Sequence, residues 1–290
     1  MGDAMLKTGV NFNDQGFKTD SDTLMRIIAE AGFDTFFSGW SADESVMDRL
    51  AELGAKYGVG YESMHAPFGG MYHIWEDNEK GAAWIDRLKA VIDSCARLGV
   101  GYTTVHATNM PQFNNNGPIG THFNDLGASR FATVAEYAAT RGVKIAIENT
   151  EFPQKEMLSL VRYLTERGLD AGFGTLWDVG HWNCYPAPAG FDFAEHFGKY
   201  LIGTHVHDNF GQKDPQVVTW NDDSHVLPFD ATIDFRQVGD TLKRSSYQGT
   251  ITLEVFRTHC HDLKWYEDYT LEGFLKDAHD RAVHVARQCE

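Results

Sequence analysis

The strongest constraint on the fold is an alternation of strand-like and helix-like segments that runs along the whole 290-residue chain. Eight short runs are rich in β-branched or aromatic residues, and an amphipathic stretch follows each of them. The runs span Lys7–Phe12, Thr35–Gly39, Gly60–His65, Tyr102–His106, Lys144–Glu148, Gly172–Asp178, Leu201–His207 and Thr250–Phe256. Eight such units without an intervening linker predict an α/β protein with a parallel sheet, closed into a single (β/α)8 TIM barrel domain over residues 1–290.

The segments between the strands have helical periodicity and clear ends. Trp84, Leu88 and Val91 lie on one face of a predicted helix after the third run. Glycines are expected to close the helices that precede six strands, namely Gly32, Gly58, Gly99, Gly142, Gly168 and Gly249. Two connections, Thr108–Gly120 and Asn209–Pro228, are unusually long. Both follow a strand, so we expect them at the carboxyl-terminal face, where barrel enzymes carry their active sites.

The charge of the chain argues against several classes of partner. There are 41 acidic residues against 25 Lys and Arg, which gives a formal net charge of −16. This excess disfavours nucleic acid and an anionic membrane surface as partners. No apolar run approaches the ~20 residues of a membrane span, and no signal peptide is visible. Four cysteines without CxxC spacing predict free thiols and a cytoplasmic protein, with self-association left open.

Polar side chains interrupt the apolar strands mainly at their carboxyl-terminal ends. The residues at these ends, or in the loops just after them, are His65, His106, Glu148, Asp178, His181, His205, His207, Asp223, His225 and Glu254. In a closed barrel these ends meet at one mouth, where unpaired carboxylates would be costly to bury. Few basic residues lie nearby to pair with them; Arg257 is the nearest. A divalent cation such as Mn²⁺, Zn²⁺, Mg²⁺ or Co²⁺ would satisfy both the imidazoles and the carboxylates.

Five short motifs carry this set in chain order. They are ENT at Glu148, DVGH from Asp178 to His181, HVHDN from His205 to Asn209, DSHVLP from Asp223 to Pro228, and LEVF around Glu254. In this order the motifs resemble the xylose-isomerase-like barrel superfamily, which contains sugar isomerases, sugar epimerases and endonuclease IV. The resemblance spans roughly residues 60–256. It implies Glu148, Asp178, His205 and Glu254 as metal ligands, with Asp208 orienting His205.

The resemblance also implies a reaction. It predicts a metal-dependent isomerase or epimerase of a sugar or polyol, in which a proton is removed next to a carbonyl and the metal stabilises the resulting enediolate. Glu148 and Glu254 would be the acid/base residues, and His181, Trp182 and Arg257 would contact the substrate. His65, His106, His181, His207, Asp223 and His225 are expected to bind additional metal or substrate. His207 is the least determined, because it could be a ligand, a substrate contact or a support for a ligand.

The chain departs from the ketohexose epimerases in ways that keep alternatives open. Gly211 stands where those enzymes carry a substrate-gripping Arg, and FDA at residues 229–231 replaces their GEG. No cluster of basic residues marks a phosphate site, which favours an unphosphorylated substrate. One alternative is a zinc phosphodiesterase like endonuclease IV, whose nine ligands for three zinc ions all have matching residues here. Others are an inosose-type dehydratase or lyase and a non-enzymatic metal-binding barrel.

Overall fold

The computed structural model describes residues 5–108, 123–185, 187–214, 218–258 and 264–290. Its strands are β1 (Lys7–Asn11), β2 (Thr35–Gly39), β3 (Gly60–His65), β4 (Tyr102–His106), β5 (Lys144–Glu148), β6 (Phe173–Asp178), β7 (Leu201–His205) and β8 (Thr250–Leu253). The longer helices are α1 (Ser21–Ala31), α2 (Glu44–Tyr57), α3 (Glu79–Leu98), α4 (Asp125–Thr140), α5 (Gln154–Glu166), α8 (Phe235–Arg244) and α9 (Leu271–Gln288). Shorter elements are α6 (Val179–Cys184), α7 (Phe193–Phe197), η1 (Met71–Trp75) and η2 (Gly198–Tyr200).

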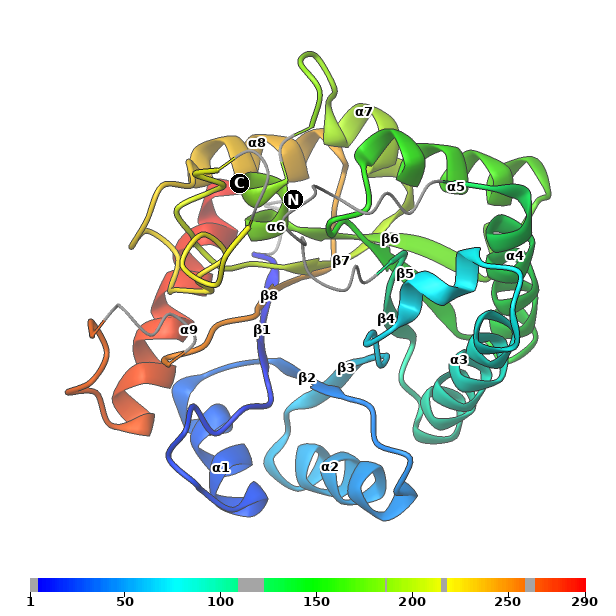
Figure 1. Cartoon of the computed structure of the whole chain (residues 1–290). Coiled ribbons are helices and arrows are strands. Elements are labelled where there is room, and N and C mark those ends of the chain that lie inside the picture. Colours follow the sequence, from blue (N-terminus) through cyan, green and yellow to red (C-terminus); the bar gives the residue numbers. More distant parts are fainter. Residues whose placement is uncertain (1–4, 109–122, 186, 215–217, 259–263) are drawn as a thin grey trace.

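The strands form one parallel sheet in the order β7-β6-β5-β4-β3-β2-β1-β8. Its two edges meet where the Val206 N–H donates to the Thr252 carbonyl at 2.8 Å and the Glu254 N–H donates to the Val206 carbonyl at 3.1 Å. The sheet is therefore a nearly closed barrel with the helices arranged around it (Figure 1). The predicted TIM barrel fold is confirmed.

Local sequence explains where the helices begin and what they bury. Side chains at the residue before the first turn accept backbone N–H groups in most of the longer helices, which satisfies donors that a helix start leaves free. These caps are Asp20, Asp43, Asn78, Asn124, Asp234 and Thr270. The predicted apolar face of α3 packs into the core, with Trp84 4% exposed and both Leu88 and Val91 fully buried.

The helix ends follow the glycine prediction with one exception. Gly32, Gly58 and Gly99 cap helices in the left-handed conformation, and the glycines at 142 and 168 also have positive φ. The prediction for Gly249 was wrong, because the left-handed residue after α8 is Ser246, with φ of 52°. Position 249 requires glycine because there is no room for a Cβ atom, which would lie 2.3 Å from the Tyr247 hydroxyl oxygen.

The loops at the carboxyl-terminal face differ in how much of them can be described. Most of the predicted connection Thr108–Gly120 lies outside the described residues. The connection between β7 and α8 forms no helix in its described part, and Asp208 and Val226 within it form an antiparallel bridge. The Phe256 N–H, just past β8, donates to the His225 carbonyl of this connection at 3.0 Å. Cys95, Cys184 and Cys289 are free thiols. None of the helices among the described residues is long and apolar enough to cross a membrane.

Candidate metal centre

The strand ends place most of the predicted residues at one mouth of the barrel. Five strands finish at a predicted ligand: β3 at His65, β4 at His106, β5 at Glu148, β6 at Asp178 and β7 at His205. Strands β7 and β8 both end earlier than predicted, so His207 and Glu254 lie just beyond them. Val206, just past β7, pairs with Leu253, the last residue of β8, and its carbonyl accepts the Glu254 N–H at 3.1 Å. These contacts keep the ends of β7 and β8 in register.

A helix cap positions two of the site residues relative to each other. Asp178 is the N-cap of α6, and its carboxylate accepts the backbone N–H of His181 at 2.6 Å. Asn149 pairs with the backbone of Asp178 in both directions, since its side chain accepts the N–H and donates to the carbonyl, each at 2.8 Å. Asn149 was not predicted as a site residue, although it lies within the ENT motif. It fixes the end of β6 against the end of β5.

Asp208 has a different role from the one that the resemblance implied. Its carboxylate accepts backbone N–H groups from Asn209, Ala231, Thr232 and Ile233 at 2.8 to 3.1 Å. All of these donors belong to the segment that joins β7 to α8. Asp208 therefore orients that segment, which carries Asp223 and His225 into the mouth, rather than the ring of His205.

All ten predicted histidines and carboxylates come together in three groups. Within each group the ligand atoms lie within 4.8 Å of one another. The first group is His65, His106 and Glu148; the second group is Glu148, Asp178, His205 and Glu254; the third group is His181, His207, Asp223 and His225.

Glu148 belongs to two of these groups, and like Asp178 it is completely buried. Its side chain has no exposed surface. Its Oε2 lies 3.1 Å from His106 Nε2 and 3.4 Å from His65 Nε2, while its Oε1 lies 3.1 Å from His205 Nδ1. The two oxygens of one carboxylate thus face the first and the second group respectively. A carboxylate in this position is suited to bridge two neighbouring cations.

The hydrogen bonds of the rings indicate which nitrogens are available as ligands. His65 Nδ1 lies 2.8 Å from the Ala66 carbonyl oxygen, and His225 Nδ1 lies 2.9 Å from that of Glu254. A carbonyl only accepts, so each Nδ1 carries the proton, and in the neutral ring Nε2 presents a lone pair. These Nε2 atoms lie 3.4 Å from Glu148 and 3.6 Å from Asp223. Acceptor atoms that face each other in this way need a proton or a metal cation between them.

Buried polar atoms without hydrogen bonds support the same conclusion. Among the described residues, eleven buried side-chain N or O atoms make no hydrogen bond of acceptable geometry, and six of them belong to the three groups. These six are His106 Nδ1, Glu148 Oε2, Asp178 Oδ2, His181 Nδ1, His205 Nε2 and His207 Nε2. Buried polar atoms are normally satisfied, so their concentration here indicates missing partners. The donor set of imidazoles and carboxylates fits divalent ions.

The electrostatics show how strongly the groups are coupled. Burial alone would raise the pKa of the Glu148 carboxyl, but the imidazoles of His205 and His106 hold it well below its ordinary value. Burial alone would lower the pKa of His205, yet Glu254 and Glu148 raise it to about 9. Likewise, Asp223 outweighs burial and raises the pKa of His225 to about 9. Glu148 is therefore ionised, and in the protein without metal the rings of His205 and His225 are both protonated at neutral pH.

Trp182 and Arg257 were predicted to contact the substrate, and in the structure both contact other residues of the chain. Trp182 packs edge-on against Phe193, at 5.4 Å between ring centroids. The Arg257 guanidinium donates to the Gln15 carbonyl at 3.1 Å and lies over the ring of Phe17. Their contact with substrate stays a prediction. Sequence reasoning did not identify Phe68, which is 44% exposed and stacks on His106 at 4.7 Å.

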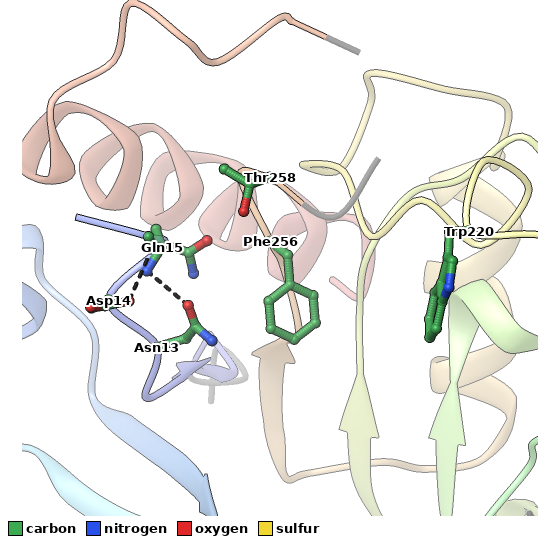
Figure 2. Close-up of a pocket in the computed structure, with 7 residues that line it drawn as sticks. Asn13, Asp14, Gln15, Trp220, Phe256 and Thr258 are labelled. Carbon is green, nitrogen blue, oxygen red and sulfur yellow. Dashed lines mark hydrogen bonds between the residues drawn. The ribbon is translucent and has the colours of Figure 1, made fainter. Parts of the chain in front are cut away.

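Two pockets open beside the centre, on the side of β1 and β8. One, of about 290 Å³, is lined by Trp40, His65, Phe68 and Glu254 among others. The other, of about 340 Å³, lies between the 13–16 turn and Trp220, with the Phe256 ring in its middle (Figure 2). Both share Asn13 and Phe256, so they adjoin along the rim. None of the described residues that line either pocket is Lys or Arg.

Comparison with known families agrees with this architecture. A family model described as xylose isomerase-like TIM barrel matches residues 25–277. This chain belongs to the xylose isomerase-like TIM barrel family. The resemblance found in the five motifs is confirmed. The curated relatives that match are themselves described as uncharacterized proteins. One of them, y4fM of Sinorhizobium fredii, is 28% identical over 268 residues, which cover 89% of this chain and 80% of that protein.

Solved structures show the shared barrel at lower sequence identity. The IolI protein, described with a bound zinc atom, superposes with a TM-score of 0.74 at 18% identity, covering 98% of this chain and 99% of that one. An L-ribulose 3-epimerase superposes with a TM-score of 0.70 at 16% identity, covering 98% and 96%. At these identities the likeness establishes the family fold, and the chemistry has to be inferred from the site.

Proposed function

We propose that this family member is a divalent-metal-dependent isomerase or epimerase of an unphosphorylated sugar or polyol. The observation that supports this most directly is the second group, in which His205 Nδ1 lies 3.1 Å from Glu148 and 3.5 Å from Glu254. One of these carboxylates, Glu254, also lines the pocket of about 290 Å³. A metal-ligand group is thus directly adjacent to a space for a small substrate.

The lining of that pocket fits an uncharged, polyhydroxylated molecule. Aromatic side chains at Phe37, Trp40 and Phe68 offer apolar faces for sugar C–H groups, and Asn13 and Ser38 offer polar atoms for hydroxyls. A phosphorylated substrate would call for basic side chains, which the described lining does not contain. Neighbouring barrels in this fold are described as an L-ribulose 3-epimerase and a D-psicose 3-epimerase with D-tagatose, which agrees with this class of substrate.

The two glutamates are not equivalent in this structure. The Glu254 side chain is 14% exposed and reaches the pocket, whereas Glu148 is fully enclosed by histidines. We therefore assign Glu254 the removal of the substrate proton next to the carbonyl. A bound divalent ion would supply positive charge to the substrate oxygens as that proton leaves. Glu148 acts as a shared ligand, and its predicted part in returning the proton stays a hypothesis.

The donor composition of the groups also bears on the metal. The third group offers three imidazoles and one carboxylate, a set that favours Zn²⁺ or Co²⁺. The second group offers three carboxylates and one imidazole, which suits Mn²⁺ or Mg²⁺ as well. We propose that the protein holds more than one ion, because Glu148 faces two groups with different oxygens.

A second function has a specific observation in its favour. Three adjacent groups with a shared carboxylate resemble the multinuclear centres that hydrolyse phosphodiesters, where two ions stabilise the attacking and leaving oxygens. The net charge of −16 and the absence of basic residues from the described pocket lining count against a nucleic-acid substrate. Hydrolysis of a phosphodiester therefore ranks second.

One experiment separates the two. The purified protein, with its metals quantified, is incubated in D₂O with a panel of ketoses, aldoses and inososes, and separately with duplex DNA that contains an abasic site. Carbon-bound deuterium in one sugar is the expected result, and Glu254→Gln should lower the exchange rate by about 10²–10⁴-fold. Glu195→Gln, the same change on the exposed surface of α7, should not affect it. DNA cleavage without any sugar exchange would overturn the isomerase proposal.

A further inference from the structure

His207 is the residue of the centre whose role the sequence left most open. It lies two residues past His205, the end of β7, and is fully buried. Gly180, in the first turn of α6, makes room for it, since a Cβ at that position would lie 1.9 Å from His207 Cε1. The ring is therefore seated between α6 and the loop that carries Asp223 and His225. This packing fixes the orientation of the His207 ring.

The neighbours of the two ring nitrogens define that direction. Nδ1 faces the Asp208 carbonyl at 3.4 Å, while Nε2 lies 3.2 Å from Asp178 Oδ1 and 3.8 Å from Asp223 Oδ1 without forming a hydrogen bond of acceptable geometry. The ring also stacks on His225 at 3.7 Å between centroids, with 10° between the planes.

We propose that His207 is a fourth protein ligand of a divalent ion in the third group, together with His181, Asp223 and His225. One of its ring nitrogens belongs to the same set of atoms within 4.8 Å of one another as the ligand atoms of those three residues, and its Nε2 lies 3.8 Å from Asp223 Oδ1. The inference rests on the metal-dependent part of the proposed function and is independent of the substrate. With His207 the third group offers four protein ligands, three of them imidazoles, which fill all positions of a tetrahedral zinc site. The second group also offers four, but its three carboxylates suit a six-coordinate ion such as Mn²⁺ or Mg²⁺, which keeps positions for water or substrate.

Such an ion would join three parts of the chain. His181 comes from α6, His207 from the end of β7, and Asp223 with His225 from the loop before α8. His225 is held at φ of 47°, a conformation that costs energy for a residue other than glycine and persists only where its surroundings enforce it. The ion would fix the loop over the mouth of the barrel and leave the second group, beside the pocket, as the centre that meets substrate.

The test compares metal retention in His207→Ala, His207→Cys and a control, His284→Ala, on the exposed surface of α9. Each protein is loaded with Zn²⁺, passed over a desalting column with a mild chelator, and its zinc counted by mass spectrometry. We expect the wild type and the control to keep one ion more per chain than His207→Ala, whose affinity at this site should fall at least about 10-fold.

The Cys variant keeps the inference testable if the Ala variant folds poorly. After Co²⁺ loading, His207→Cys should show the ultraviolet charge-transfer absorption of a thiolate bound to Co²⁺, which the wild type should lack. That band reports directly on whether residue 207 contacts the ion. If this band is absent, or if His207→Ala retains as much zinc as the wild type, the assignment of His207 as a ligand is overturned. The metal-dependent function would not be affected by either result. A wild-type protein that binds no divalent ion at all would overturn the metal-dependent function as well.

Discussion

The position of Glu148 between two groups leads to a quantitative prediction about metal binding. Replacing it with Gln removes the negative charge that the first and the second group share and leaves one ligand oxygen where the two groups had two. Replacing Glu254 with Gln affects the second group alone. We therefore expect Glu148→Gln to lose two bound ions per chain and Glu254→Gln to lose at most one.

The effect on stability follows from the same count. An ion present at about 100 times its dissociation constant stabilises the folded protein by about 2.7 kcal/mol at 25 °C. Loss of two such ions should lower the free energy of unfolding by about 5 kcal/mol, against about 3 kcal/mol for the loss of one. The assay is urea unfolding of each variant at a fixed excess of free metal, followed by circular dichroism, with bound metal counted in parallel by mass spectrometry.

Glu62→Gln is the matched control. Like Glu148, Glu62 is a glutamate inside the barrel, although it is only partly buried. Its carboxylate accepts hydrogen bonds from the hydroxyls of Thr35, Tyr102 and Thr252, and it belongs to none of the three groups. Its replacement should leave the metal count unchanged. Repeating the unfolding with a strong chelator should remove most of the difference between the wild type and Glu148→Gln. Equal metal loss in Glu148→Gln and Glu254→Gln would contradict the bridging position of Glu148.

Three further predictions follow from the geometry. Because the pKa values of His205 and His225 are about 9 without metal and ligation needs neutral rings, metal binding at pH 7.5 should release about two protons per chain from them, and this release should vanish above pH 9; calorimetry in buffers of different ionisation enthalpy measures it. Gly180→Ala should displace His207 and lower the free energy of unfolding by about 1–3 kcal/mol, measurable by urea unfolding. Asp208→Asn should weaken the hold on the loop before α8 and speed its cleavage by a protease at low concentration, compared with Asp240→Asn on the exposed face of α8.

The strands, and the convergence of the candidate residues at their ends, could be predicted from the sequence for a local reason. A strand of a parallel barrel is apolar on both sides, so a polar residue such as Glu148 marks the point where it reaches the mouth. The cap formed by Asp178 with His181 is also local, because its partners are three residues apart. Properties that depend on spacing along one segment were therefore predicted well.

Properties that depend on packing between segments could not be predicted from the sequence. Nothing in the sequence around Glu148 indicates that its two oxygens face different groups, because that depends on the relative positions of β3, β4, β5 and β7. The same holds for Asp208, whose partners at residues 231–233 are more than twenty positions away. Gly249 was misassigned because close contact with Tyr247, rather than positive φ, requires glycine there.

The arrangement of the three groups bears on the choice between the two proposed chemistries. Hydrolysis of a phosphodiester by a multinuclear centre needs ions with open positions for the attacking and leaving oxygens. If His207 completes the third group, a tetrahedral ion such as Zn²⁺ has all its positions filled there, whereas the three carboxylates and one imidazole of the second group suit a six-coordinate ion that keeps positions open. The openings that remain are then those of the first and second groups, of which His65 and Glu254 line the pocket of about 290 Å³. Proton transfer by Glu254 requires only the second group, so a closed third site does not affect isomerisation, while it leaves hydrolysis two open ions instead of three.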